Sequence, residues 1–198
     1  VNNNISKTQY GIYTQGANLS NKNTGNVINQ NLINTVAPNN VRQGGIFTGF
    51  EDGIQINGNN ISELAFTSDM FGIALGLTAL STTGFIGNEV TNATVSQNKI
   101  GTVIGTGTFS ASGITIANAL SGTNTISNNM ISGVFTNGTA GDFASGIFAG
   151  GGPGSTTRIY YNTVSMSRSD ILTGSGPNYA LAIGEVQPIM DVRNNILS

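Results

Sequence analysis

The chain has 198 residues and a formal net charge of −2, and only 8% of its residues are charged, against about 25% in ordinary soluble domains. Because it contains neither cysteine nor histidine, disulfide frameworks, zinc sites built on these residues and Ser-His-Asp triads are excluded. It lacks the basic face that nucleic acid requires, and its longest apolar stretch, residues 70–80, is shorter than the ~20 residues of a membrane-spanning helix. We therefore expect no nucleic-acid binding and no membrane insertion, and we treat residues 1–198 as one domain.

A seven-residue pattern recurs along the chain: an apolar residue, two residues of any type, asparagine, any residue, an apolar residue, and then Ser, Asn or Gly. A partial copy ends at residue 6, and full copies follow at 28–34, 56–62, 95–101, 126–132, 159–165 and 192–198. A period of roughly 20–50 residues indicates a stacked array of repeats. The fixed asparagines are Asn3, Asn31, Asn59, Asn98, Asn129, Asn162 and Asn195, which define six intervals of about 32 residues.

Each interval contains a second marker, a Gly-Ile pair with strand-like alternation around it, as in Gly113-Ile114-Thr115-Ile116. In chain order, an interval starts at the asparagine, continues through an apolar position and a variable loop to the Gly-Ile strand, and ends in a short period-2 strand before the next asparagine. The largest insertion is expected at residues 77–92. The Gly-Ile pairs are at 11–12, 45–46, 72–73, 113–114 and 146–147, with Ala180-Leu181 as a degenerate sixth, and a further apolar column follows the asparagines at Val36, Leu64, Val103 and Val134.

This pattern predicts an all-β fold, a right-handed parallel β-helix of about six coils in which each interval makes one turn. Sustained helical periodicity is missing, which excludes helical solenoids, and regular two-residue hairpins are missing, which argues against a propeller. The apolar columns argue against disorder. We expect each fixed asparagine to sit at a sharp corner in the left-handed conformation, and the asparagines to form a hydrogen-bonded ladder at the strand spacing of about 4.8 Å.

The repeats also resemble a known family. The segments Asn128-Asn129-Met130-Ile131-Ser132, 160–164 and 192–196 are similar to those of right-handed parallel β-helix repeat proteins, in particular the large secreted surface proteins of bacteria that export through the type IX pathway. The resemblance implies an extracellular or cell-surface location and a segment of a longer protein, in which adjoining coils, domains or subunits cover the open ends. It implies a structural or adhesive rod, although lyases also occur in this family.

Catalytic chemistry is not indicated by the residues. A glycosidase needs two carboxylates that face each other, and the nine acidic residues are scattered over different intervals. Only Glu51 and Asp52 are adjacent, and neighbours on a strand point to opposite faces. The glycine-rich run 150–154 lacks the lysine and helix of a phosphate-binding loop. We therefore expect no catalytic residue, no bound metal and no cofactor.

Three aromatic residues suggest an alternative function. Tyr13, Phe47 and Phe148 each follow a Gly-Ile pair, so alternation places them on the outer face if the isoleucines point inward. Exposed aromatic rings could stack on sugars, which makes a polysaccharide or other surface glycan the candidate ligand of a carbohydrate-binding or polysaccharide-degrading domain. The opposing interpretation is that loops cover these rings.

Overall fold

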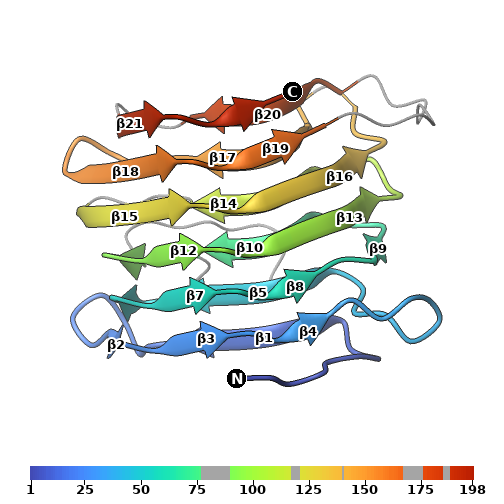
Figure 1. The fold of residues 1–198 in the computed structure, drawn as a ribbon, viewed down its shortest axis with the longest axis horizontal. Coiled ribbons are helices and arrows are strands. Elements are labelled where there is room, and N and C mark those ends of the chain that lie inside the picture. The colour runs from blue at the N-terminus through green and yellow to red at the C-terminus, as the bar shows by residue number, and fades with distance from the viewer. Residues whose placement is uncertain (77–89, 117–120, 140, 167–175, 185–187) are drawn as a thin grey trace.

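The computed structural model describes residues 1–76, 90–116, 121–139, 141–166, 176–184 and 188–198. Every regular element within these ranges is a β-strand, and the strands of successive repeats lie one above the other (Figure 1). In this part of the chain no helix is long and apolar enough to cross a membrane. The all-β fold and the parallel stacking of the repeats are as the sequence predicts.

Sheet 1 is formed by the strands that contain the Gly-Ile pairs. Its six strands pair in parallel and in repeat order, with the isoleucines in register, so that Ile46 lies between Ile12 and Ile73. The strands are β1 (Tyr10–Gln15), β5 (Gly44–Gly49), β10 (Met70–Leu75), β14 (Ala111–Ile116), β17 (Ala144–Ala149) and β20 (Asn178–Ile183).

Sheet 2 is formed by the strands that precede the ladder asparagines, again all parallel and in repeat order. These are β3 (Val27–Asn29), β7 (Gln55–Asn57), β12 (Thr94–Ser96), β15 (Gly122–Ser127), β18 (Ser155–Tyr160) and β21 (Ile189–Arg193).

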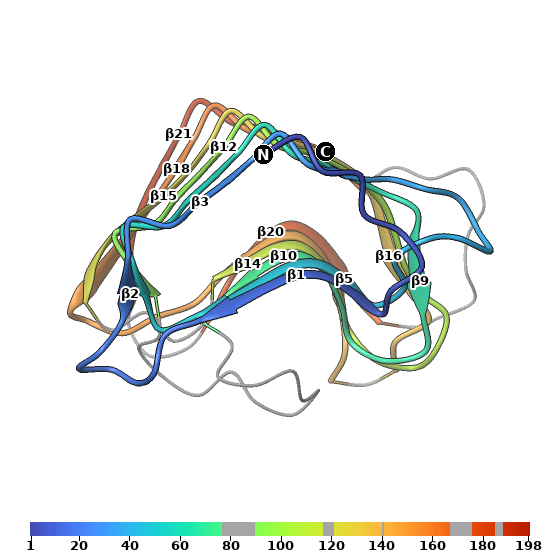
Figure 2. The same ribbon diagram turned by 90° about the horizontal axis from the view of Figure 1, so that it is seen from below.

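Sheet 3 is formed by the strands that follow the ladder asparagines: β4 (Leu32–Ile33), β8 (Asn60–Ile61), β9 (Leu64–Phe66), β13 (Lys99–Gly105), β16 (Met130–Thr136), β19 (Thr163–Ser165) and β22 (Ile196–Leu197). A small sheet contains β2 (Asn23–Thr24), β6 (Glu51–Asp52) and β11 (Val90–Thr91). Seen along the stack, sheet 2 forms one side of the cross-section, sheet 1 lies opposite it, and the sheet 3 strands β16 and β9 run down the side between them (Figure 2).

Side chains that point inward from the three large sheets make one apolar core, in which Ile46, Ile56 and Ile100 are essentially inaccessible to solvent. Burial of each such side chain stabilises the fold by about 1.5–3 kcal/mol. Sheets 1 and 3 approach so closely that the glycine column is required. A Cβ at Gly72 would lie 2.5 Å from the carbonyl oxygen of Gly113 and 2.8 Å from Cγ2 of Ile100.

The fixed asparagines form the predicted ladder. Nδ2 of Asn98 donates to Oδ1 of Asn129 at 3.0 Å and to the carbonyl oxygen of Ile56 at 2.8 Å. Oδ1 of Asn98 accepts from both the backbone nitrogen and Nδ2 of Asn59, at 3.0 and 2.9 Å. All four hydrogen-bonding positions of this buried amide are therefore used. The same side-chain bond links neighbours from Asn3 to Asn195.

The left-handed corner lies one residue earlier than the sequence predicts. The ladder asparagines do not have positive φ, whereas the residue before each of them does. This arrangement turns the chain before the asparagine, so the asparagine side chain can point inward to its neighbours in the ladder. The corner residues, with φ between 55° and 64°, are Asn2, Gln30, Gly58, Gln97, Asn128, Tyr161 and Asn194.

One position of the second apolar column is also wrong. Val103 pairs with Leu64 and Val134, as expected, but Val36 is exposed. Val36 begins a turn closed by a hydrogen bond from the Asn39 nitrogen to its carbonyl oxygen at 3.1 Å, which carries it out of the column. Most of the insertion expected at 77–92 lies outside the described residues.

Candidate functional site

We call Tyr13, Phe47 and Phe148 the aromatic column of sheet 1. Of these residues, Phe47 is buried rather than exposed on the outer face. This side chain is only 3% exposed, and its ring centroid lies 5.2 Å from that of Tyr10 and 5.7 Å from that of Phe71. Gly44 makes room for it, since a Cβ there would lie 2.4 Å from Cζ of Phe47. Phe47 does face away from the main core, but its expected exposure is wrong because its neighbours on both sides are also aromatic.

The other two predicted aromatic residues are far apart. Tyr13 is 40% exposed, and Phe148 is half-buried beside Phe143, with ring centroids 5.7 Å apart. Four strand steps along sheet 1 separate Tyr13 from Phe148, a distance of about 19 Å. Glycan binding by Tyr13 or Phe148 stays a prediction, but the structure does not join the three residues into one exposed patch.

The carboxylates of Asp69 and Asp142, which belong to different intervals of the sequence, both accept hydrogen bonds from Ser110. Asp69 Oδ1 accepts from the backbone nitrogen of Ser110 at 3.1 Å, and Asp142 Oδ1 accepts from Ser110 Oγ at 2.9 Å. Burial raises the pKa of Asp69, the hydrogen bond from Ser110 opposes this, and the charge of Asp142 adds to it. Within the described residues, no group of three or more acidic side chains is placed to hold a metal ion.

Glu51 and Asp52 point to different environments, as alternation predicts. The fully buried Glu51 carboxylate accepts from Thr14 Oγ1 at 2.7 Å, from Asn23 Nδ2 at 3.0 Å and from Asn26 Nδ2 at 3.0 Å. Asp52 accepts from Thr91 and Asn92 at the surface of the neighbouring repeat. Each carboxylate has hydrogen-bond donors of its own, which indicates structural roles.

A continuous polar line runs along the outside of the stack where sheet 2 ends. Neighbouring corners are linked by backbone hydrogen bonds, such as those from the nitrogen of Asn128 to the oxygen of Tyr160 at 3.1 Å and from the nitrogen of Tyr161 to the oxygen of Arg193 at 3.2 Å. We call this line the corner track. It consists of the last residues of the sheet 2 strands, Asn29, Asn57, Ser96, Ser127, Tyr160 and Arg193, and of the corners Gln30, Gly58, Gln97, Asn128, Tyr161 and Asn194.

The N-terminal part of the corner track is hollowed. An open groove of about 320 Å³ is lined by Asn29, Gln30, Asn57, Gly58, Ser96 and Gln97. Gly58 leaves a gap in the row of corner side chains, and two of the lining residues are joined by a hydrogen bond from Ser96 Oγ to Asn57 Oδ1 at 2.7 Å. The groove therefore offers amide and hydroxyl groups and no charged one.

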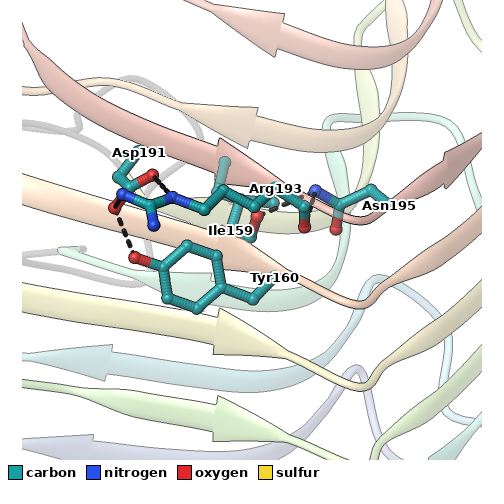
Figure 3. A network of polar contacts seen from close by, with 5 residues as sticks. All are labelled: Ile159, Tyr160, Asp191, Arg193 and Asn195. Carbon is teal, nitrogen blue, oxygen red and sulfur yellow. Dashed lines mark hydrogen bonds and ion pairs between the residues drawn. The ribbon is translucent and has the colours of Figure 1, made fainter.

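The C-terminal part of the corner track carries a fixed aromatic and ionic network (Figure 3). Tyr160 donates from its hydroxyl to Asp191 Oδ2 at 2.5 Å, and Arg193 binds the same carboxylate through Nε at 2.6 Å and Nη2 at 2.8 Å. The guanidinium lies 5.9 Å from the ring centroid of Tyr160, and the ring of Tyr161 meets that of Tyr160 edge-on at 6.3 Å.

These contacts shift the ionisation of all three polar groups. The hydrogen bond to Asp191 raises the pKa of Tyr160, and the hydrogen bonds from Tyr160 and then Arg193 lower the pKa of Asp191. The hydrogen bond to Asp191 also raises the pKa of Arg193. At neutral pH the network therefore consists of a neutral tyrosine, a carboxylate and a guanidinium. Sequence reasoning missed it because Tyr160 and Asp191 meet only through the pairing of β18 with β21.

Comparison with known proteins finds no matching protein-family model, no significantly similar curated protein and no significantly similar solved structure.

Proposed function

We propose that the chain is a right-handed parallel β-helix segment with a structural or adhesive role, displayed on the outside of a bacterial cell or secreted as part of a rod or filament. The observation that carries this proposal is the ladder, which continues from Asn3 to Asn195 without a break. A continuous ladder inside in-register parallel sheets ties each repeat to the next along the whole stack. Such an array suits load-bearing better than it suits a mobile catalytic cleft.

The location at the cell surface rests on the resemblance of the repeats to secreted bacterial surface proteins. The low charge fits this proposal, because the chain is covered by asparagine, serine and threonine rather than by charged side chains.

The exposed side of the last repeat supports a stacking partner. Ile183, Val192 and Leu197 hold positions whose equivalents in the preceding repeat are buried, yet they are 51%, 40% and 42% exposed. Apolar side chains in register with a core favour a further covering layer. We propose that another coil, a domain or a subunit packs over them.

Single-molecule pulling tests the load-bearing role. One repeat of about 32 residues adds about 110 Å when it is extended, so detachment should proceed in steps of this size or its multiples. Smooth extension at low force, without steps, would argue against a load-bearing stack. A parallel assay for new reducing ends or unsaturated products on a panel of polysaccharides should stay negative, and turnover would replace the structural role with an enzymatic one.

A further inference from the structure

We infer that the corner track binds a neutral polysaccharide chain, which lies parallel to the stacking direction across the outer edge of sheet 2. This inference goes beyond the structural role proposed above, and it places carbohydrate recognition on a different face from the aromatic column of sheet 1. It is carried by an unusual tyrosine, by the groove at Gly58, and by the arrangement of charge.

Tyr161 is the unusual tyrosine. It adopts φ 56°, in the left-handed region, where a bulky side chain is disfavoured. The other corners carry asparagine, glutamine or glycine, which shows that the turn itself does not require an aromatic residue. Tyr161 is 59% exposed, and its ring meets that of Tyr160 edge-on, so the Tyr161 ring adds little to the fold. A strained and exposed residue that the fold does not need points to a role in recognition.

The ring of Tyr161 lies edge-on against the hydrogen-bonded ring of Tyr160. Asp191 holds the hydroxyl of Tyr160, and the guanidinium of Arg193 lies over the Tyr160 ring. The hydrogen bond to Asp191 restricts the Tyr160 ring, against which the Tyr161 ring lies edge-on.

The rest of the corner track supplies hydrogen-bonding groups at a regular spacing. Consecutive corners lie about 4.8 Å apart, so the six repeats from Gln30 to Asn194 offer a line of about 24 Å. This step is of the same order as the length of one pyranose unit, so successive sugars meet successive repeats. Amides and hydroxyls both donate and accept, as sugar hydroxyls do, and the groove at Gly58 provides depth where the aromatic rings are absent.

Charge on the corner track favours a neutral ligand. Among the residues of the corner track, Arg193 is the charged one. Its Nε and Nη2 donate to the carboxylate of Asp191 at 2.6 and 2.8 Å. The groove at the other end is lined by uncharged side chains. Arg158 lies opposite Asp191 in the register of β18 and β21 and is exposed. Because this cation could attract an acidic oligosaccharide, such a ligand is the appropriate comparison in the test.

Titration calorimetry with soluble hexasaccharides of glucose, mannose and xylose tests the inference, with an oligogalacturonate as the acidic arm. The wild-type chain should bind at least one neutral hexasaccharide, and the affinity should persist at about 1 M NaCl, where exposed charges are screened. Tyr161→Asn should weaken binding at least tenfold, which corresponds to about 1.4 kcal/mol. Asparagine suits the left-handed corner, so this variant should remain folded.

Two further variants separate recognition from folding. Gly58→Gln places in the groove the residue that both flanking corners carry, and a Cβ there would meet only Gln30 Cγ at 3.5 Å. It should also weaken binding, and because the left-handed φ of 64° disfavours a side chain it should lower the melting temperature slightly without unfolding the chain. Tyr13→Ala, which removes an exposed tyrosine from sheet 1, should leave binding unchanged.

Several results would overturn the inference: no binding to any neutral hexasaccharide, binding that Tyr161→Asn leaves intact, loss of binding in Tyr13→Ala, or binding only to the oligogalacturonate with loss in salt. None of these results bears on the stepwise extension under force, so the structural role is tested separately.

Discussion

Asn98 and Asn129 hold the same position in neighbouring repeats, and Nδ2 of Asn98 donates to Oδ1 of Asn129 at 3.0 Å. Asn129 in turn donates to Oδ1 of Asn162 at 2.9 Å and to the carbonyl oxygen of Val95 at 2.9 Å. Each amide is therefore both donor and acceptor for its neighbours. Removing one of them breaks contacts with the repeats on both sides.

Asn98→Ala should destabilise the chain by about 3–5 kcal/mol, because four hydrogen bonds are lost and buried partners are left unsatisfied. Denaturant unfolding measures the change. Asn60→Ala is the matched control, since Asn60 follows a ladder asparagine but points outward, and its effect should stay within about 0.5 kcal/mol. Equal effects of the two variants would contradict the structural role of the ladder.

Glu51→Ala should cost about 2–4 kcal/mol, because it leaves the partly buried donors of Thr14, Asn23 and Asn26 without their acceptor. Glu63→Gln is the control, with an expected change within about 0.5 kcal/mol. A stability of Glu51→Ala equal to that of the wild type would show that the carboxylate is not needed to satisfy these donors.

Thr48→Val should stabilise the chain by about 1 kcal/mol, since Thr48 is fully buried and its hydroxyl has no hydrogen-bond partner. Thr14 occupies the same position in the preceding repeat, but its hydroxyl donates to Glu51. Thr14→Val should therefore destabilise the chain. The two substitutions are chemically identical, so unfolding curves that shift in the same direction would contradict this assignment of hydrogen bonds.

The stability of Asp69→Asn relative to the wild type should rise as the pH rises from 3 to 7. Burial raises the pKa of Asp69 above its usual 3.8, so the folded wild type binds more protons than the unfolded chain just above that pH and loses stability as the pH increases. The asparagine variant does not have this loss. Melting temperatures of both proteins across this range provide the test.

Asp52→Asn should show the opposite trend. Hydrogen bonds from Asn92 and Thr91 lower the pKa of Asp52, so its contribution to stability is present above pH 3.8 and is lost as the pH falls through the folded pKa. The variant should therefore be less stable than the wild type at pH 7, with a smaller difference at pH 3. Parallel trends for Asp69→Asn and Asp52→Asn would refute at least one of the two assignments.

Much of the fold could be predicted because the repeats are similar to one another. When Ile46, Ile73 and Ile114 recur beside the same glycine, in-register stacking buries all of them at once, and a shift of register would expose them. The ladder follows from the same regularity. The position of the corner was harder to predict from the sequence, because either Gln97 or Asn98 could take the left-handed conformation. Only the ladder hydrogen bonds, which require Asn98 to point inward, place that conformation at Gln97.

The sequence by itself determined the repeats, the parallel all-β architecture and the asparagine ladder, because each depends on residues that recur at equivalent positions. The tertiary structure alone decided which outward-facing side chains are covered by their neighbours and which contact one another. Phe47 is buried by Tyr10 and Phe71 from the two neighbouring repeats, and Tyr160 meets Asp191 only across a strand pair. Such contacts join non-equivalent residues of different repeats, so the repeat pattern of the sequence does not predict them. They depend on how the side chains of adjacent repeats pack against one another.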